Sequence, residues 1–305
     1  MPELVWPDDD DSRPLPGMTA DVFLPVPDAE TFEVAAREWL GWLPGLLAPA
    51  EWEEVLRGDK PPFSGKPEVV WPGYDEWAEP FMTWGEIVVT PLKWNGMRTQ
   101  VRRVSRASLE WLVEVLADRP VSAGIYVFRV DASGAQLPGG VTVSAQSGLG
   151  RPGELIPVGE LHARDSLMWR PGARSEGAEE LRNRLAEAAR AVARRPGVTG
   201  VLAGLDTAVD FAAPFSGPPQ LGWEEAVLER ELVGYSWITM CTPSVVARLG
   251  GVSGLRDSGA FWRVDELPGG GALLQATERA GQYDQAAAEK AFAVLAPALP
   301  PVGER

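Results

Sequence analysis

Apolar residues recur at helical spacing in several stretches of the chain. In residues 30–43 every third or fourth position is apolar, which places one apolar stripe along a helix. The stripe consists of Phe32, Ala35, Ala36, Trp39, Leu40 and Leu43. The same spacing predicts helices over residues 105–117 and 179–195, and Pro196 with Gly197 ends the second of these.

Short runs rich in β-branched and aromatic residues lie between and after these helices. Runs of this kind, bounded by Gly, Pro or Asp, predict β-strands. They are residues 86–90, 125–130, 141–145, 198–205, 235–240, 261–266 and 272–277. The mixture of both patterns predicts a fold built from helices and sheet together.

Turn and cap residues indicate strand, helix, hairpin and helix in the last quarter of the chain. Pro243 suits the first turn of a helix, where its missing N–H costs no hydrogen bond, and Gly250-Gly251 ends that helix. The Leu-Pro-Gly-Gly-Gly sequence at 267–271 joins two strands through glycines that readily adopt positive φ. Asp284 caps the last helix and Pro297 ends it.

The sequence Leu-Pro-Gly-Gly occurs twice, at residues 137–140 and 267–270. Each copy lies between two strand-like runs, with a strand and a helix before it and a helix after it. We therefore predict an α+β fold of two pseudo-repeated β-α-β-β-α units, with a mainly antiparallel sheet covered by helices. This prediction includes the hypothesis that the two copies form equivalent hairpins.

Composition divides the chain into three parts. Residues 1–27 are rich in Pro and Asp and predict an irregular acidic tail. Residues 28–210 are a Trp-rich α+β half. Residues 211–305 hold the C-terminal β-α-β-β-α module, which either folds alone or forms one domain with the preceding half.

The 305 residues include 43 acidic and 28 basic side chains, for a net charge of −15. This balance opposes binding to nucleic acid, which needs clustered positive charge, and favours a basic protein partner. The first residues lack the basic and apolar regions of a secretory signal, and no apolar run approaches the roughly 18 residues of a membrane span. The single cysteine, Cys241, suits a reducing cytoplasm. We expect a cytoplasmic protein without membrane contact.

Few residues offer recognisable catalytic chemistry. His162 is the one histidine, so two-histidine zinc sites are excluded. No Gly-x-Ser-x-Gly sequence occurs, and the glycine pattern at 148–153 contains Pro152 and opens no helix that would hold a phosphate. We expect no metal, no cofactor and no enzymatic activity. The alternative is a hydrolase or transferase with its site around His162, Arg164 and Asp165.

The segment 69–84 mixes aromatic and acidic residues without a clear period. Aromatic loops with nearby charge are typical of protein interfaces. The candidate partner-binding residues are Trp71, Asp75, Glu76, Trp77 and Glu79. The other interpretation is a loop whose tryptophans pack inward over the core.

The C-terminal module resembles bacterial immunity proteins associated with type VI secretion and polymorphic toxins. The resemblance rests on the Gly234-Tyr235-x-Trp237 strand, the helix after Pro243, the glycine hairpin and the closing helix, and it covers about a quarter of the chain. It implies a non-enzymatic protein that binds and neutralises a cognate toxin, although it leaves the toxin and the oligomeric state open. A structural protein of a secretion locus is a further alternative.

Overall fold

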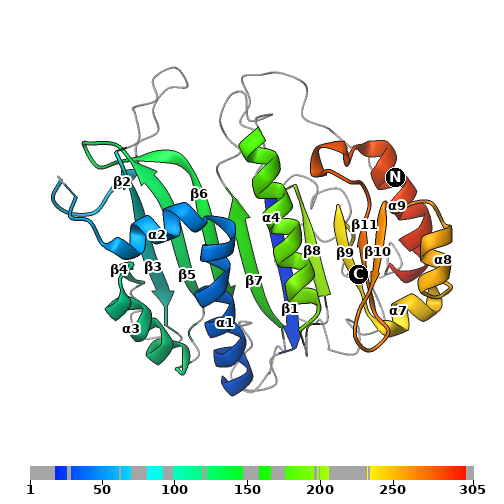
Figure 1. Cartoon of the computed structure of the whole chain (residues 1–305). Helices are drawn as coiled ribbons and strands as arrows, with labels where there is room; N and C mark the ends of the chain where they lie inside the picture. The colour runs from blue at the N-terminus through cyan, green and yellow to red at the C-terminus, as the bar shows by residue number, and fades with distance from the viewer. Residues whose placement is uncertain are drawn as a thin grey trace. The chain divides into compact units, whose positions relative to one another are not determined.

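The structure is a computed structural model, shown in Figure 1. It describes residues 18–25, 29–61, 63–69, 81–91, 99–118, 120, 122–146, 158–165, 176–195, 198, 200–205, 232 and 234–299. The chain divides into two compact units. The first-half unit comprises Pro27–Ser147 and Leu161–Arg170, and the C-terminal unit comprises Met1–Val26, Gly148–Glu160 and Pro171–Arg305.

The first-half unit contains three described helices, α1 (Ala29–Leu47), α2 (Pro49–Arg57) and α3 (Arg106–Leu116). The predicted stripe of α1 is buried at Ala36, Trp39, Leu40 and Leu43. Helix α3 begins at a capping box, in which Ser105 and Ser108 each accept the backbone N–H of the other. The helices predicted over residues 30–43 and 105–117 are therefore confirmed.

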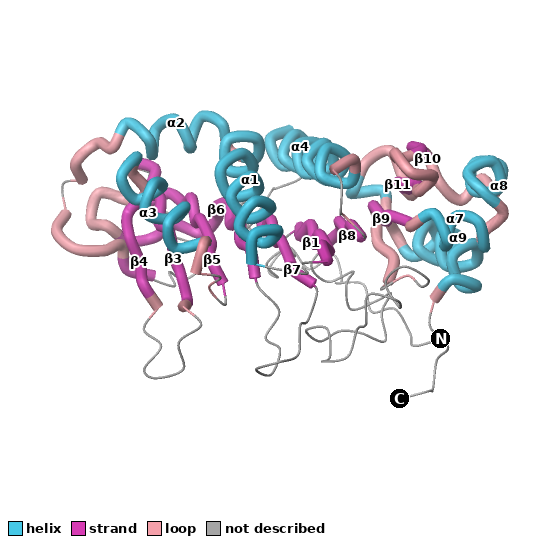
Figure 2. Tube along the Cα trace, turned by 90° about the horizontal axis from the view of Figure 1, so that it is seen from below, coloured by secondary structure: helices cyan, strands magenta, loops and turns pink. Residues whose placement is uncertain are grey.

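The strands of this unit form a largely antiparallel sheet. They are β2 (Glu68–Val69), β3 (Met82–Thr90), β4 (Gln100–Arg103), β5 (Ser122–Val130) and β6 (Ala135–Gln146). The order is β6-β5-β3-β4, and the short β2 runs parallel to β6. Helices α1, α2 and α3 lie on one side of these strands (Figure 2).

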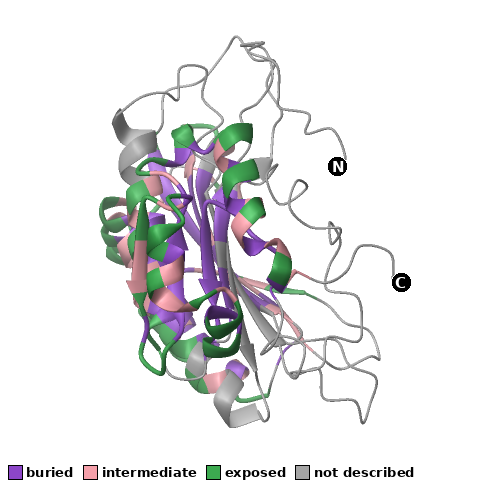
Figure 3. Ribbon diagram, turned by 90° about the vertical axis from the view of Figure 1, so that its right-hand side faces the viewer, coloured by how far each residue is buried: buried purple, intermediate pink, exposed green. Residues whose placement is uncertain are grey.

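Alternation along β3 and β5 decides which side chains face those helices. Thr83 on β3 bonds Glu54 of α2, and Arg129 on β5 pairs with Glu51 of the same helix. Their alternate neighbours Ile87 and Ile125 are fully buried on the same face. Figure 3 shows the buried residues gathered along the strands, with exposed residues on the outer sides of the helices.

The C-terminal unit is built from separate stretches of chain. Its strands are β1 (Met18–Pro25), β8 (Gly200–Leu205), β9 (Ile238–Cys241), β10 (Arg263–Glu266) and β11 (Ala272–Gln275). They pair antiparallel in the order β10-β11-β9-β8-β1. The residues of β7 (Val158–Asp165) are assigned partly to one unit and partly to the other.

Helices cover both faces of the C-terminal sheet. They are α4 (Glu176–Ala193), α7 (Pro243–Arg248), α8 (Gly251–Asp257) and α9 (Gln285–Leu295), with 3-10 turns at Ala280–Gln282 and Ala296–Ala298. Leu274 and Gln275 are neighbours on β11, so their side chains point to opposite faces. Gln275 bonds Arg190 of α4, whereas Leu274 packs in a core with residues of α7, α8 and α9. The predicted α+β class, with antiparallel strands covered by helices, is confirmed.

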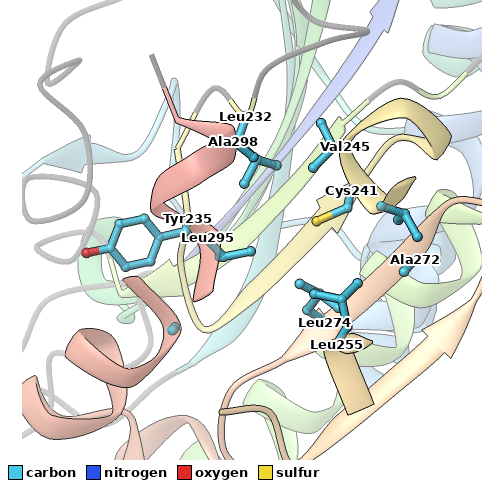
Figure 4. Close-up of a cluster of buried hydrophobic side chains, with 11 residues drawn as sticks. Leu232, Tyr235, Cys241, Val245, Leu255, Ala272, Leu274, Leu295 and Ala298 are labelled. Carbon is cyan, nitrogen blue, oxygen red and sulfur yellow. The ribbon is translucent and has the colours of Figure 1, made fainter. Parts of the chain in front are cut away.

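That core is shown in Figure 4. It gathers buried side chains from β9, β11 and the three C-terminal helices. Its members are Leu232, Tyr235, Cys241, Val245, Val246, Leu255, Ala272, Leu274, Ala291, Leu295 and Ala298. Thr242 caps α7 and Asp284 caps α9 through their side-chain oxygens, so the predicted cap at Asp284 is confirmed.

The end predicted for the helix after Pro243 is confirmed: α7 ends just before Gly250 and Gly251, both with positive φ, and α8 begins directly at Gly251. The prediction of two equivalent Leu-Pro-Gly-Gly hairpins is wrong. Leu-Pro-Gly-Gly at 267–270 forms the turn between β10 and β11, whereas the copy at 137–140 lies inside β6. The reversal between β5 and β6 is made by Asp131–Gly134, where Asp131 accepts the N–H of Ser133 and of Ala135. The two copies are therefore not equivalent hairpins.

Candidate partner-binding surface

The segment proposed from the sequence as a partner surface is described only at its end. Trp71, Asp75, Glu76, Trp77 and Glu79 lie outside the described residues. Phe81, Met82 and Trp84 follow them at the start of β3. Phe81 is 55% exposed, whereas Met82 and Trp84 are buried. Of the described aromatic residues in this segment, one therefore faces solvent and one packs inward.

Trp84 belongs to an aromatic cluster on the face of β3 opposite to Thr83. The cluster joins Met82, Trp84, Phe128 and Val130, and Phe63 lies with its ring centroid 5.5 Å from that of Trp84. The guanidinium carbon of Arg103 lies 4.3 Å from the centroid of the Trp84 ring, close enough for a cation–π interaction. Trp84 also donates its indole N–H to Glu86. This tryptophan is a structural residue.

Phe81 itself is held by the backbone. Its backbone N–H donates to the carbonyl of Val130 at 2.8 Å, which adds one backbone hydrogen bond at the end of the β3–β5 ladder. Thr83, two residues further on, donates both its N–H and its hydroxyl to the carboxylate of Glu54, at 2.9 and 2.7 Å. The exposed ring is thus attached to a rigid strand end that is tied to α2.

Carboxylates of α2 lie on one side of this strand end. Burial alone would raise the pKa of Glu54, but the hydrogen bonds from Thr83 and the charges of Arg57 and Arg129 outweigh it and lower the pKa. Glu54 is therefore ionised at neutral pH. Glu51 pairs with Arg129 at 3.0 Å, and Glu53 on the same helix is exposed.

A second exposed aromatic residue, Trp262, precedes the edge strand β10. Its side chain is 52% exposed, and its backbone N–H donates to the carbonyl of Ala276 at 3.2 Å. Arg263, the next residue, pairs with Asp265 at 2.8 Å, and Glu266 at the end of β10 is exposed. No pattern in the sequence singles out Trp262, because its exposure depends on where β10 lies in the sheet.

The first residues on which the resemblance to immunity proteins rests are part of the packing of the C-terminal unit. Gly234, Tyr235 and Trp237 are buried, and Trp237 donates its indole N–H to the carbonyl of Thr277. The ring of Tyr235 lies 5.9 Å from that of Phe292 on α9. Tyr235 thus contacts the last helix, Trp237 is bonded to the residues that follow β11, and neither ring is free for a partner.

A mostly buried arginine connects α4 to the same module. Arg190 donates to the side-chain carbonyl of Gln275, and its guanidinium lies 3.9 Å from the carboxylate of Asp265. Gln275 is buried and donates in turn to the carbonyls of Thr277 and Glu278. This network orients α4 on the sheet.

The alternative hypothesis, a hydrolase or transferase site around His162, concerns residues of which only the backbone is described. His162, Arg164 and Asp165 lie in β7, and their side chains are outside the described set. Among described side chains, no three His, Cys, Asp or Glu residues gather into a group that could hold a metal ion. None of the described helices combines the length and apolar character needed to cross a bilayer.

The fold has a counterpart among solved structures. A T6SS (type VI secretion system) protein of Pseudomonas aeruginosa matches it with a TM-score of 0.50 and 12% sequence identity, over 93% of this chain and 73% of that one. No family model and no curated protein matches the chain. At this identity the match shows a shared fold.

Proposed function

We propose that this chain is an immunity protein of a T6SS or related toxin locus, and that it binds and neutralises a cognate toxin. The observation that carries the proposal is the fold match, over 93% of this chain, to a T6SS protein. The resemblance of the C-terminal module to immunity proteins narrows the role from secretion in general to toxin neutralisation. The protein acts in the cytoplasm, by binding rather than by catalysis.

The test is a titration of the purified chain against the protein encoded immediately upstream of its gene. We expect a 1:1 complex of nanomolar or tighter affinity, and loss of the partner's toxicity when both proteins are expressed together. Failure to bind this neighbour, combined with unchanged toxicity, would contradict the proposal.

A structural role in the secretion apparatus is the second candidate, because the matched protein's name specifies T6SS and no more. Deletion of the gene distinguishes the two. Loss of an immunity protein leaves the cell sensitive to its own toxin while secretion continues, whereas loss of a structural component stops secretion of every effector.

The enzymatic alternative is tested by His162→Ala. A hydrolase or transferase built around His162 would lose its biological effect in this variant. An immunity protein would retain toxin binding and protection.

A further inference from the structure

We propose that Phe81, together with the carboxylates at the junction of α2 and β3, docks a basic segment of the protein partner. This inference rests on the proposed function, and it assigns the contact surface and the partner's chemistry. Phe81 exposes 55% of its surface although its backbone is fixed by the hydrogen bond to Val130. An aromatic ring on a rigid strand end loses little freedom on binding, which is typical of interface anchors.

The charges on α2 and at the turn after β5 favour a cationic partner. Glu54 is tied to Thr83, two residues beyond Phe81, and Glu51 lies one helical turn before Glu54. Asp131 follows Val130, whose carbonyl accepts the N–H of Phe81. Together with the exposed Glu53 there are four carboxylates, against the guanidinium groups of Arg57 and Arg129. A Lys- or Arg-rich segment would find an aromatic face and a surplus of negative charge at the same place.

Trp262 provides an internal comparison, because its ring is almost as exposed. Its surroundings carry no such surplus. The carboxylates of α8 and β10, at Asp257, Asp265 and Glu266, are matched by the guanidinium groups of Arg190, Arg256 and Arg263. A basic segment therefore gains more electrostatic attraction at Phe81 than at Trp262. The net charge of −15 draws a cationic protein towards the whole molecule, and the local surplus selects the place where it docks.

The test compares Phe81→Ala with Trp262→Ala in binding to the upstream-encoded toxin. We expect Phe81→Ala to weaken binding by about 30-fold or more, and Trp262→Ala to stay within about twofold of the wild type. Phe81→Tyr keeps the ring and should bind as the wild type does. Because both rings are exposed, all three variants should keep the wild-type thermal unfolding curve.

A matched pair of charge variants tests the electrostatic part. Glu53→Gln and Glu266→Gln each remove one exposed carboxylate, but only Glu53 lies on α2. We expect Glu53→Gln to slow association by about two- to threefold at low salt and Glu266→Gln to have a smaller effect. The difference should vanish at about 300 mM NaCl, where charges are screened.

The outcomes separate this inference from the proposed function. If the wild type binds and Phe81→Ala binds equally well, the Phe81 surface is wrong while the immunity function stands. If Trp262→Ala weakens toxin binding more than Phe81→Ala does, the Phe81 surface is wrong and the contact lies on the C-terminal unit. If the wild type does not bind its neighbour at all, both proposals are overturned.

Discussion

At the scale of single residues, burial determines the chemistry of the one thiol. Cys241 is fully buried in the core of the C-terminal unit, and burial raises its pKa to about 12. Thiolate is the reactive form of cysteine, so the folded protein holds almost none of it at neutral pH. This thiol is part of the core packing.

We therefore predict that Cys241 does not react with Ellman's reagent in the folded protein. In denaturant the same chain should release one equivalent of thionitrobenzoate, because the unfolded thiol returns to a pKa of about 8.5. Rapid reaction of the folded protein would mean that the core of the C-terminal unit opens readily.

At the scale of elements, one glycine sets the distance between α2 and β3. A Cβ on Gly85 would lie 2.5 Å from a methyl carbon of Val55 on α2 and 2.9 Å from one of Val104. Neither valine side chain has a flexible end that could move away. The helix that carries Glu51 and Glu54 can approach the strand because position 85 has no side chain.

Gly85→Ala should lower the free energy of unfolding by about 1–3 kcal/mol through overpacking. Gly41→Ala is the matched control, since its Cβ would meet nothing within 4 Å on α1. There alanine should raise stability by up to about 1 kcal/mol, because it is the better helix former. Urea denaturation measures both, and an equal effect of the two substitutions would contradict this account of the α2–β3 contact.

Elements that are determined by residues close together in the sequence could be predicted. Elements that form through contacts with distant parts of the chain could not. The apolar stripe of α1 and the cap of α9 depend on neighbouring residues only. Strand β4 has three polar residues out of four, and it becomes a strand through its pairing with β3. The candidate surface could not be predicted for the same reason. The position of Phe81 depends on its hydrogen bond to Val130, and the carboxylates of the surface lie on α2 and at Asp131.

At the scale of the whole molecule, the C-terminal module does not contain its own complete sheet. Strand β9 pairs with β11 on one side and with β8 on the other, and α4 covers the face that carries Gln275. Strand β8 and helix α4 both precede the module in sequence, so a fragment that starts at residue 232 lacks them.

We predict that residues 232–305 do not fold stably alone. Ile238, which is fully buried in the intact chain and paired with Ala203 of β8, would face solvent. The fragment should bind the dye ANS and unfold without a cooperative thermal transition, while the full chain shows one. A cooperative transition of the fragment would demonstrate that the module is self-sufficient.

The position of β1 in the sheet also affects how the chain folds while it is being synthesised. In the sheet order β1 lies between β8, where Leu205 is opposite Met18, and β7, which begins at Val158, so this first described strand has no partner until the ribosome has made some 130 residues more. At about 5–20 residues per second, this strand waits roughly seven to thirty seconds. Throughout that interval its backbone N–H and C=O groups lack their native sheet partner and are open to wrong pairing. A newly made chain should therefore depend on chaperones around β1 before β7 and β8 leave the ribosome.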